Sequence, residues 1–505
     1  MDTLMSLQSG LISMVTNPEM LICLILGVFG GLVFGSIPGL TAALGVTLML
    51  PFTYAMSAGQ GLATLIGIFV GGISGGLVSA VLLNIPGTPS SIVTTFDGAP
   101  MARNGRPGDA LALGVFSSLI GGLFAGLVLI LVAPWLAKVA VIFGAWEYFA
   151  LGVMGLCIVV ALCSQDMVKG LMSAIVGLLI AMVGYDAVSG VPRFTFGFWQ
   201  LGGGLGTMSV LMGLFAFAEI LSQIKGLSKR TEKLEPQKMK LFPPRDALKG
   251  TGRVFALGSV IGTIIGILPG IGQTTASLLT YNVARQTSKD PEKYGTGIPE
   301  GIVASETANN AVCGGALIPM MTMGIPGDLV TAILLGGLII HGLQPGPGLF
   351  TYNADIVNII YVAYLLSNVI MFLMLMLLMR IFIKVLSVPS NYLYATILLM
   401  CIIGAYTVNN RLFDCWVLVI VGIVGYILLK SGFTLTPIIL GYILGPIIET
   451  NFRTAIISNR GDVTSIFGSP IAVALILFGI AMAVVPSILE NRKRKKQQEA
   501  ACDCG

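Results

Sequence analysis

Gly31–Thr41 reads GLVFGSIPGLT, and the related stretch Gly262–Thr274 reads GTIIGILPGIGQT. Each is an apolar run with glycines four residues apart that reaches a Pro-Gly pair and then turns polar. Proline removes a backbone donor and disfavours helix just before it, while glycine tolerates positive φ. Each stretch is therefore predicted to be a membrane helix that stops at the Pro-Gly pair, with another helix starting beyond it.

A second motif follows in both halves of the chain. Gly75-Gly76 precedes Ile85-Pro86-Gly87 in the first half, and Gly314-Gly315 precedes Ile325-Pro326-Gly327 in the second. Composition alone rarely produces two matched motifs in the same order, so the pattern predicts an internal duplication.

Composition indicates a membrane protein. Of the 505 residues, 55% are hydrophobic and 10% charged, against about 45–50% and about 25% in soluble domains. Runs such as Leu111–Val132 and Val362–Met379 are long enough to cross a hydrocarbon core as helices. A β-barrel would need short alternating segments instead. We predict an all-α polytopic membrane protein with about 12–15 transmembrane or re-entrant helical segments and Pro-Gly broken helices.

The two repeats are predicted to have inverted topology. Arg103 and Arg106 follow the second motif of the first half, whereas Arg285 and Lys293 precede that motif in the second half. Opposite biases at matched positions are typical of inverted repeats, because positively charged loops stay in the cytoplasm. The prediction makes 97–109 and 286–298 cytoplasmic and 341–352 external.

Charge also predicts the domain boundaries. Basic residues gather in Lys225–Arg253 and in the RKRKK run at Arg492–Lys496, and both belong in the cytoplasm by the same rule. No signal peptide is expected, so the first span would be retained. We expect a first membrane repeat over 19–224, a basic cytoplasmic linker over 225–253, a second membrane repeat over 254–487 and a basic cytoplasmic tail over 488–505.

Polar residues follow every predicted helix break. A helix N-terminus presents free N–H groups and a partial positive charge, so it attracts anions. Ser and Thr in membrane helices also commonly cap the helix or bond back to carbonyls, and this interpretation stays open for each residue singly. Breaks in two matched pairs favour a binding site for a carboxylate substrate, with the expected members Gly39, Thr41, Gly87, Thr88, Ser90, Ser91, Gly270, Gln273, Thr274, Asn309, Asn310, Gly327 and Asp328.

Glu306 is the most informative charge inside a predicted span. It belongs to Ser305-Glu306-Thr307-Ala308-Asn309-Asn310, a polar patch just before the last break. Ionisable residues within membrane helices usually mark ion or substrate pathways. Glu306 could ligate a cation, carry a proton or contact substrate; capping of the helix that enters at Pro299 is the structural alternative. We assign it to cation coupling, with Na⁺ or H⁺ as the ion. No cofactor and no metal site are expected.

The other charged residues near the predicted spans allow a structural explanation. Asp97, Arg103, Arg106 and Asp109 surround a turn-rich sequence, where a salt-bridged structural loop and a substrate contact both remain open. Four acids lie near predicted span ends, where reaching into the interface accounts for them: Glu147, Asp186, Glu219 and Asp414.

These motifs resemble those of the large membrane subunit of the tripartite tricarboxylate transporters, over about Gly27 to Pro486. The family usually has Pro before the Glu of its ETANNA-like patch, where this chain has Ser305. The resemblance is carried by Gly31–Thr41, Asn84–Gly108 (NIPGTPSSIVTTFDGAPMARNGRPG), Gly262–Thr274, Gly301–Ala311 (GIVASETANNA) and Gly324–Asp328 (GIPGD).

The resemblance implies a secondary transporter of the bacterial inner membrane. Such a transporter works with a small four-span membrane subunit and a periplasmic solute-binding protein. It would import carboxylates, such as the tricarboxylate citrate or related di- or monocarboxylates, by symport with Na⁺ or H⁺.

Other classes of function fit less well. An ATP-driven pump would need a phosphate loop, and no GxxxxGK[ST] occurs in the sequence. An intramembrane aspartyl protease would need Asp186 and Asp328 at one depth, and nothing in the repeat pairs them. A channel is harder to exclude. The expected function is therefore transport and not enzyme catalysis, and no nucleic-acid partner is expected.

Overall fold

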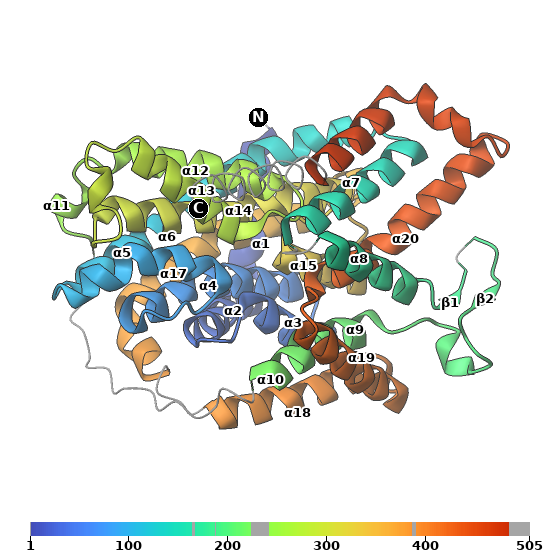
Figure 1. The fold of residues 1–505 in the computed structure, drawn as a ribbon, viewed down its shortest axis with the longest axis horizontal. Coiled ribbons are helices and arrows are strands. Elements are labelled where there is room, and N and C mark those ends of the chain that lie inside the picture. Colours follow the sequence, from blue (N-terminus) through green and yellow to red (C-terminus); the bar gives the residue numbers. More distant parts are fainter. Residues whose placement is uncertain (1, 164–166, 187, 224–241, 386–389, 484–505) are drawn as a thin grey trace, which may run out of the picture. The chain divides into compact units, whose positions relative to one another are not determined.

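The computed structural model describes residues 2–163, 167–186, 188–223, 242–385 and 390–483. They fold into two compact units (Figure 1). Unit 1 comprises Met1–Ala140 and Thr207–Ile423, and unit 2 comprises Val141–Gly206 and Val424–Gly505. Both units draw on both halves of the chain, so they are not the two repeats, whose boundaries stay a prediction. Most of the predicted basic linker and all of the C-terminal tail lie outside the described residues.

Unit 1 is built from helices in two stretches of the chain. The first stretch contains α1 (Asp2–Thr16), α2 (Pro18–Ser36), α3 (Ala42–Thr53), α4 (Ala58–Leu83), the 3-10 helix η1 (Pro89–Ser91), α5 (Ile92–Arg103) and α6 (Pro107–Ala140). The second contains α9 (Thr207–Met212), the π-helix η3 (Gly213–Phe217), α10 (Ala218–Gln223), α11 (Arg245–Leu248), α12 (Gly252–Ile267), α13 (Gly272–Gln286), η5 (Pro291–Lys293), α14 (Pro299–Met323), α15 (Leu329–Ile340), α16 (Pro347–Tyr352), α17 (Ala354–Val385), α18 (Ser390–Asn409) and most of α19 (Leu412–Lys430).

Unit 2 is a smaller helical body with one short hairpin. Its elements are α7 (Ala145–Cys163), α8 (Met167–Ala181), β1 (Gly184–Tyr185), β2 (Pro192–Arg193), η2 (Trp199–Leu201), α20 (Leu435–Ser458), η6 (Val463–Gly468) and a helix over Pro470–Ala483. The strands β1 and β2 pair antiparallel, with Gly184 opposite Arg193. Helix α20 packs against α7 and α8.

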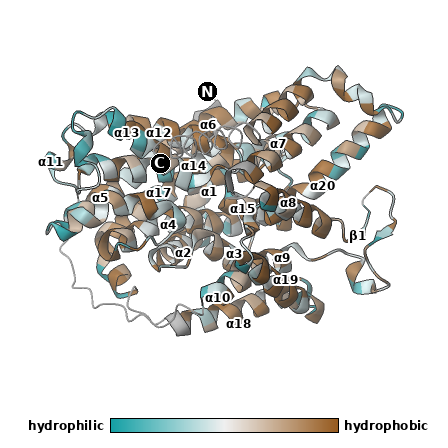
Figure 2. Cartoon of the chain, viewed as in Figure 1, coloured by the Kyte–Doolittle hydropathy of each residue, from teal (hydrophilic) through white to brown (hydrophobic). Residues whose placement is uncertain are grey.

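The predicted fold class is confirmed. Among the described residues, six helices are long and apolar enough to cross a membrane, and nine shorter apolar helices accompany them. Figure 2 shows apolar colouring along most helices, with polar residues gathered around α11, α13 and the end of α5. The protein is an all-α polytopic membrane protein, as its composition requires.

The two segments predicted to face the cytoplasm lie against each other. The Asn104 side chain donates a hydrogen bond of 3.3 Å to the carbonyl of Thr296. Residues 97–109 and 286–298 are therefore on the same side of unit 1, which is the arrangement that the charge pattern requires.

Two features of unit 1 differ from the sequence analysis. Helix α1 lies ahead of the first predicted repeat, which was expected to begin at residue 19. The sequence Asp97-Gly98-Ala99-Pro100 was interpreted as turn-rich but lies inside α5. Pro100 is accommodated there near the helix end, where its missing N–H costs one helical hydrogen bond.

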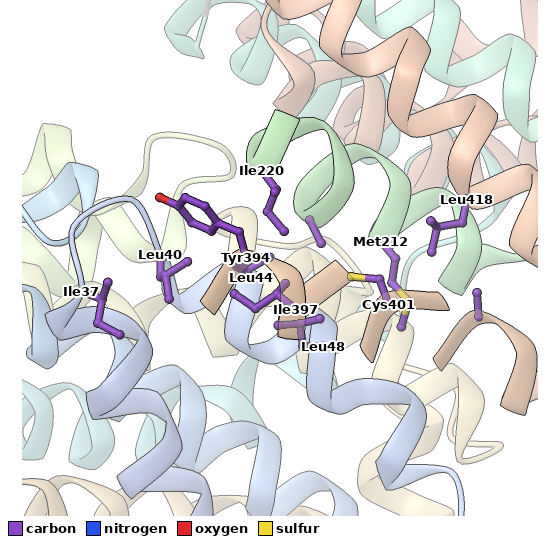
Figure 3. Close-up of a cluster of buried hydrophobic side chains, with 12 residues drawn as sticks. Ile37, Leu40, Leu44, Leu48, Met212, Ile220, Tyr394, Ile397, Cys401 and Leu418 are labelled. Carbon is purple, nitrogen blue, oxygen red and sulfur yellow. The ribbon is translucent and has the colours of Figure 1, made fainter. Parts of the chain in front are cut away.

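An apolar cluster holds the first helix break against the second stretch of unit 1. Figure 3 shows Leu44 and Leu48 of α3 facing Met212 of α9 and Ile397 of α18. Because lipid is as apolar as these side chains, the cluster stabilises the fold through close packing and not through exclusion of water.

Two of the four acids near predicted span ends are almost fully buried, Asp186 at 6% and Asp414 at 1% exposed. Asp186 pairs with Arg453 and Arg193, and Asp414 pairs with Arg411 at 3.2 Å. A buried carboxylate needs such partners because leaving water is costly for a charge.

The remaining two acids are hydrogen-bonded. Glu147 accepts from the N–H of Gly144 at 2.8 Å and from the Ser469 hydroxyl. Glu219 accepts from the Gln223 amide at 2.6 Å. All four side chains are thus fixed by specific partners within their own units.

Candidate functional site

The first Pro-Gly break separates α2 from α3. Helix α2 ends at Ser36, and Gly39 has φ of +89°, the left-handed conformation that suits glycine. Thr41 is the N-cap of α3 and accepts a 3.2 Å hydrogen bond from the N–H of Leu44. The helix stops and restarts as predicted, and Thr41 acts as a cap.

A glutamine from another part of unit 1 covers this break. Gln223, at the end of α10, donates hydrogen bonds to the carbonyl of Gly39 at 2.7 Å and to Glu219 at 2.6 Å. Its own oxygen accepts from the Tyr394 hydroxyl at 2.5 Å. Gln223 therefore binds the free carbonyl that the break exposes.

The Pro86-Gly87 break carries a compact group of buried hydroxyls. Thr88, Ser90 and Ser91 are each at most 4% exposed. The N–H of Thr88 donates to the Ser91 hydroxyl at 3.2 Å, and that hydroxyl donates back to the Thr88 carbonyl at 2.8 Å. The Thr88 and Ser90 hydroxyls lie 3.0 Å apart. Thr88 and Ser91 form a capping box at the start of η1, and the three side chains lie close together at the break.

The other two breaks meet each other directly. Gly270 donates its N–H to the carbonyl of Gly327 at 2.8 Å, and the Gln273 amide donates to the Asp328 carboxylate. Thr274, by contrast, is exposed on α13. Four of the five predicted members at these two breaks therefore come together, and Thr274 lies apart from them.

Asp328 fills the N-terminus of α15. Its carboxylate accepts from the N–H of Thr331 at 2.7 Å, and its own N–H donates to the Thr331 hydroxyl at 2.9 Å. This reciprocal capping box satisfies the N–H groups of Asp328 and Thr331 and places a carboxylate at the positive end of the helix. The anion expected at this helix start is thus supplied by the protein itself.

Equivalent glycines make equivalent contacts in the two halves. A Cβ on Gly87 would lie 2.3 Å from the carbonyl oxygen of Gly35, and a Cβ on Gly327 would lie 2.3 Å from that of Gly266. Gly35 and Gly266 occupy the same position in the two copies of the first motif. The Pro86-Gly87 loop therefore packs against the end of α2, and the Pro326-Gly327 loop packs against the end of α12. Only glycine, which has no Cβ, permits so close an approach.

The polar patch of α14 is fully buried and binds helices of the first half. Glu306 is 0% exposed. Its carboxylate accepts from the Thr94 hydroxyl of α5 and, at 3.1 Å, from the Ser118 hydroxyl of α6. Thr94 also lies 3.2 Å from the Ser305 hydroxyl. The predicted coupling residue thus sits where three helices from both halves meet.

A small residue on α6 allows this approach. A Cβ on Gly121 would lie 2.1 Å from the carbonyl oxygen of Thr307, so the two backbones touch. Ser118 lies one turn earlier on α6 and is brought within reach of Glu306. Small residues at such contacts are typical of close helix packing in membranes.

The two asparagines of the patch behave differently. Asn310 accepts a 2.6 Å hydrogen bond from the Ser74 hydroxyl of α4 and donates to the backbone carbonyl of Glu306 at 3.2 Å. Asn309 is 1% exposed and approaches the Glu306 carboxyl, yet neither of its amide atoms makes a hydrogen bond of good geometry. Asn310 thus links α14 of the second half to α4 of the first half, whereas the amide of Asn309 is available to bind another group.

Asp97 has a structural role next to this patch. It is 0% exposed and accepts from the Tyr281 hydroxyl at 2.8 Å. Its other oxygen accepts from the N–H groups of Gly295, Gly297 and Ile298 at 2.8–3.0 Å. Asp97 therefore fastens the loop that leads into α14 onto α5. The predicted salt-bridged loop is correct only for Arg106 and Asp109, which pair at 3.0 Å.

Several residues of the site were not singled out from the sequence. They are uncharged groups, all buried except the half-buried Gln223: Ser74, Ser118, Gln223, Ser277 and Tyr281. Each contacts the site through a partner far away in the chain, so no local motif marks it.

Comparison with known proteins gives a consistent assignment. The model of the tripartite tricarboxylate transporter TctA family matches residues 21–440. An uncharacterized 52.8 kDa protein in the TAR-I ttuC' 3' region of Agrobacterium vitis is 35% identical over 497 residues, which is 98% of this chain and 99% of the relative. An uncharacterized protein in the TAR-II ttuC' 3' region of the same organism is 35% identical over 234 residues, 46% of this chain and 97% of the relative. No solved structure matches.

Proposed function

Because the chain belongs to the tripartite tricarboxylate transporter TctA family, we propose that it is the large permease subunit of a binding-protein-dependent secondary transporter. The transporter imports a carboxylate, either a tricarboxylate such as citrate or a related di- or monocarboxylate. It acts with a small four-span membrane subunit and a periplasmic solute-binding protein in the bacterial inner membrane.

The observation that carries this proposal is the pairing of polar helix breaks in a unit that also holds a buried carboxylate. Broken helices at the interface of two repeats are how many secondary transporters bind charged substrates near the middle of the membrane. The hydroxyls of Thr88, Ser90 and Ser91 gather at one break. The start of α15 is already neutralised by Asp328. We therefore assign the substrate carboxylate to the break at Thr88–Ser91.

Glu306 is proposed to couple import to a Na⁺ or H⁺ gradient. It is a buried acid, and among the described residues no Lys, Arg or His forms an ion pair with it. An uncompensated charge is costly in such a place. Occupation by a cation or a proton would neutralise it, so its charge would change as the ion binds and leaves.

Reconstitution tests the proposal. The chain in proteoliposomes should support little uptake of labelled citrate, tartrate or succinate alone, and adding the small membrane subunit and the cognate binding protein should restore uptake under an imposed gradient. Saturable uptake that depends on the gradient distinguishes a transporter from a channel. Full uptake by the isolated chain, or flux that does not saturate, would contradict it.

The inverted topology is part of the same proposal and has its own test. Single cysteines on a cysteine-free background should react from the cytoplasm beside Arg106 and Lys293, and from outside beside Gln344. Labelling of all three from one side would exclude inverted repeats.

A further inference from the structure

More oxygen atoms lie near Glu306 than a proton carrier needs. The carboxylate accepts from the hydroxyls of Thr94 and Ser118 and is approached by the amide of Asn309, and the Thr94 hydroxyl in turn lies 3.2 Å from that of Ser305. All five side chains are at least 99% buried. A protonated carboxyl would be satisfied by a single acceptor. A hard cation, in contrast, gathers several oxygen ligands.

We propose that Glu306, Thr94, Ser118, Ser305 and Asn309 form a Na⁺ site that joins α5, α6 and α14. The role of Na⁺ as the coupling ion rests on the proposed function. The binding site itself is inferred from the geometry alone. Hydroxyls rotate freely, so those that donate to Glu306 in the structure can turn their lone pairs toward an ion.

The charge balance of the pocket favours a monovalent cation. Glu306 is the only acid among the five groups, and it forms no ion pair within the described part of the chain. One carboxylate neutralises one positive charge in a buried place. A divalent ion would leave an excess charge, which a low-dielectric interior disfavours.

Asn309 is the independent sign that a ligand belongs here. It is 1% exposed, and both amide atoms are without a hydrogen bond of good geometry. Buried polar atoms almost always have a partner. An ion bound between Glu306 and Asn309 would be coordinated by the amide oxygen of Asn309.

The site would connect the two halves of unit 1. Thr94 and Ser118 come from the first half, and the other three ligands come from the second. An ion that holds α5 and α6 against α14 stabilises the assembled state by mass action. Na⁺ should therefore raise the unfolding temperature, whereas K⁺ should raise it less, because hydroxyls that lie within hydrogen-bond distance of the carboxylate would have to move further apart for a larger ion.

Na⁺ binding to the purified full chain provides the test, with no substrate or partner subunit present. Isothermal titration calorimetry in an N-methyl-glucamine buffer measures affinity, and unfolding without Na⁺ checks that each variant is folded. Ser118→Ala and Thr94→Val should weaken Na⁺ binding at least about tenfold, and Glu306→Gln should abolish it.

The chain supplies a matched control beside each ligand. Ser117 bonds to the carbonyl of Leu113 at 2.7 Å, and Thr95 bonds to that of Ile92 at 2.6 Å. Neither hydroxyl is hydrogen-bonded to Glu306, so Ser117→Ala and Thr95→Val should keep wild-type affinity for Na⁺. Equal weakening in these controls and in the ligand variants would overturn the site.

The outcomes also separate this inference from the proposed function. Wild-type protein that binds no Na⁺ but takes up carboxylate on a proton gradient would overturn the Na⁺ site and leave the importer intact. Na⁺ binding that is lost in Glu306→Gln, in a reconstituted complex that takes up no carboxylate, would support the site and contradict the importer.

Discussion

The N–H of Gly270 donates a 2.8 Å hydrogen bond to the carbonyl of Gly327, which ties the two breaks of the second half together through their backbones. The same Gly327 rests on the end of the broken helix α12, at Gly266. Because this contact involves backbone on both sides, it leaves no space for a side chain.

Gly327→Ala and Gly87→Ala should abolish uptake. The added methyl would lie 2.3 Å from the carbonyl oxygen of Gly266 or Gly35 respectively. Relieving such a clash requires the loop to move, at about 1–3 kcal/mol of unfolding free energy. Uptake by reconstituted protein and thermal unfolding in detergent measure the two effects.

The control is a glycine inside α15, beyond the loop. A Cβ on Gly336 would meet only the Leu211 side chain, at an ordinary 3.6 Å. Gly336→Ala should therefore leave uptake intact and raise stability by up to about 1 kcal/mol through helix propensity. If both loop variants, Gly87→Ala and Gly327→Ala, transport normally, the breaks serve helix packing and not transport.

Gln223→Leu should loosen the first break. The substitution removes the donor to the Gly39 carbonyl and leaves the Tyr394 hydroxyl one partner short. Leaving buried polar groups unsatisfied costs about 1–3 kcal/mol. Tyr394→Phe removes only one of these hydrogen bonds, so its effect on the unfolding temperature should be smaller. Gln286→Leu, at an exposed position of α13, should change little, and an equally small effect of Gln223→Leu would refute the role given to Gln223.

Asp97→Ala should strongly destabilise the chain without touching the proposed ligands of Na⁺. Three backbone N–H groups and the Tyr281 hydroxyl would lose their acceptor, which we expect to cost about 3 kcal/mol or more. Tyr281→Phe should cost less. Asp109→Ala breaks a surface ion pair with a half-exposed Arg106, and such pairs contribute at most about 1 kcal/mol. Unfolding in detergent should rank the three in that order.

Acid should destabilise unit 2 through Asp186. The N–H groups of Ser189 and Val188, together with the Arg453 guanidinium, hold the pKa of this carboxyl well below its usual range. A depressed pKa in the folded state stabilises the fold above the ordinary Asp value of about 4, and this contribution is lost as the pH falls through the folded value. Unfolding temperatures measured from neutral pH downward should fall below about pH 4.

Asp186→Asn should flatten that part of the profile, because the group no longer titrates. Asp355→Asn, at an exposed position of α17, serves as the control and should leave the profile unchanged. A profile that is the same for wild type and Asp186→Asn would remove Asp186 as the acid-sensitive group.

Local chemistry in the sequence was enough for the membrane fold and for its broken helices. Pro-Gly pairs act on their own neighbours, so the ends of α2 and α12 at Ser36 and Ile267 follow from the residues beside them. The start of α15 follows the break expected at Pro326-Gly327. It is marked by the capping box between Asp328 and Thr331, which is a local pattern that can be recognised in sequence.

The composition of the site depended on tertiary structure. Glu306 stood out in the sequence because a charge is rare inside an apolar span. Ser118 did not, because one hydroxyl in a long apolar run has no periodicity and no charge. Thr94 and Ser118 reach Glu306 across 212 and 188 positions of the chain. Contacts at such separations arise only when α5 and α6 pack against α14, so the sequence could name the acid but only the fold could decide which oxygen atoms surround it.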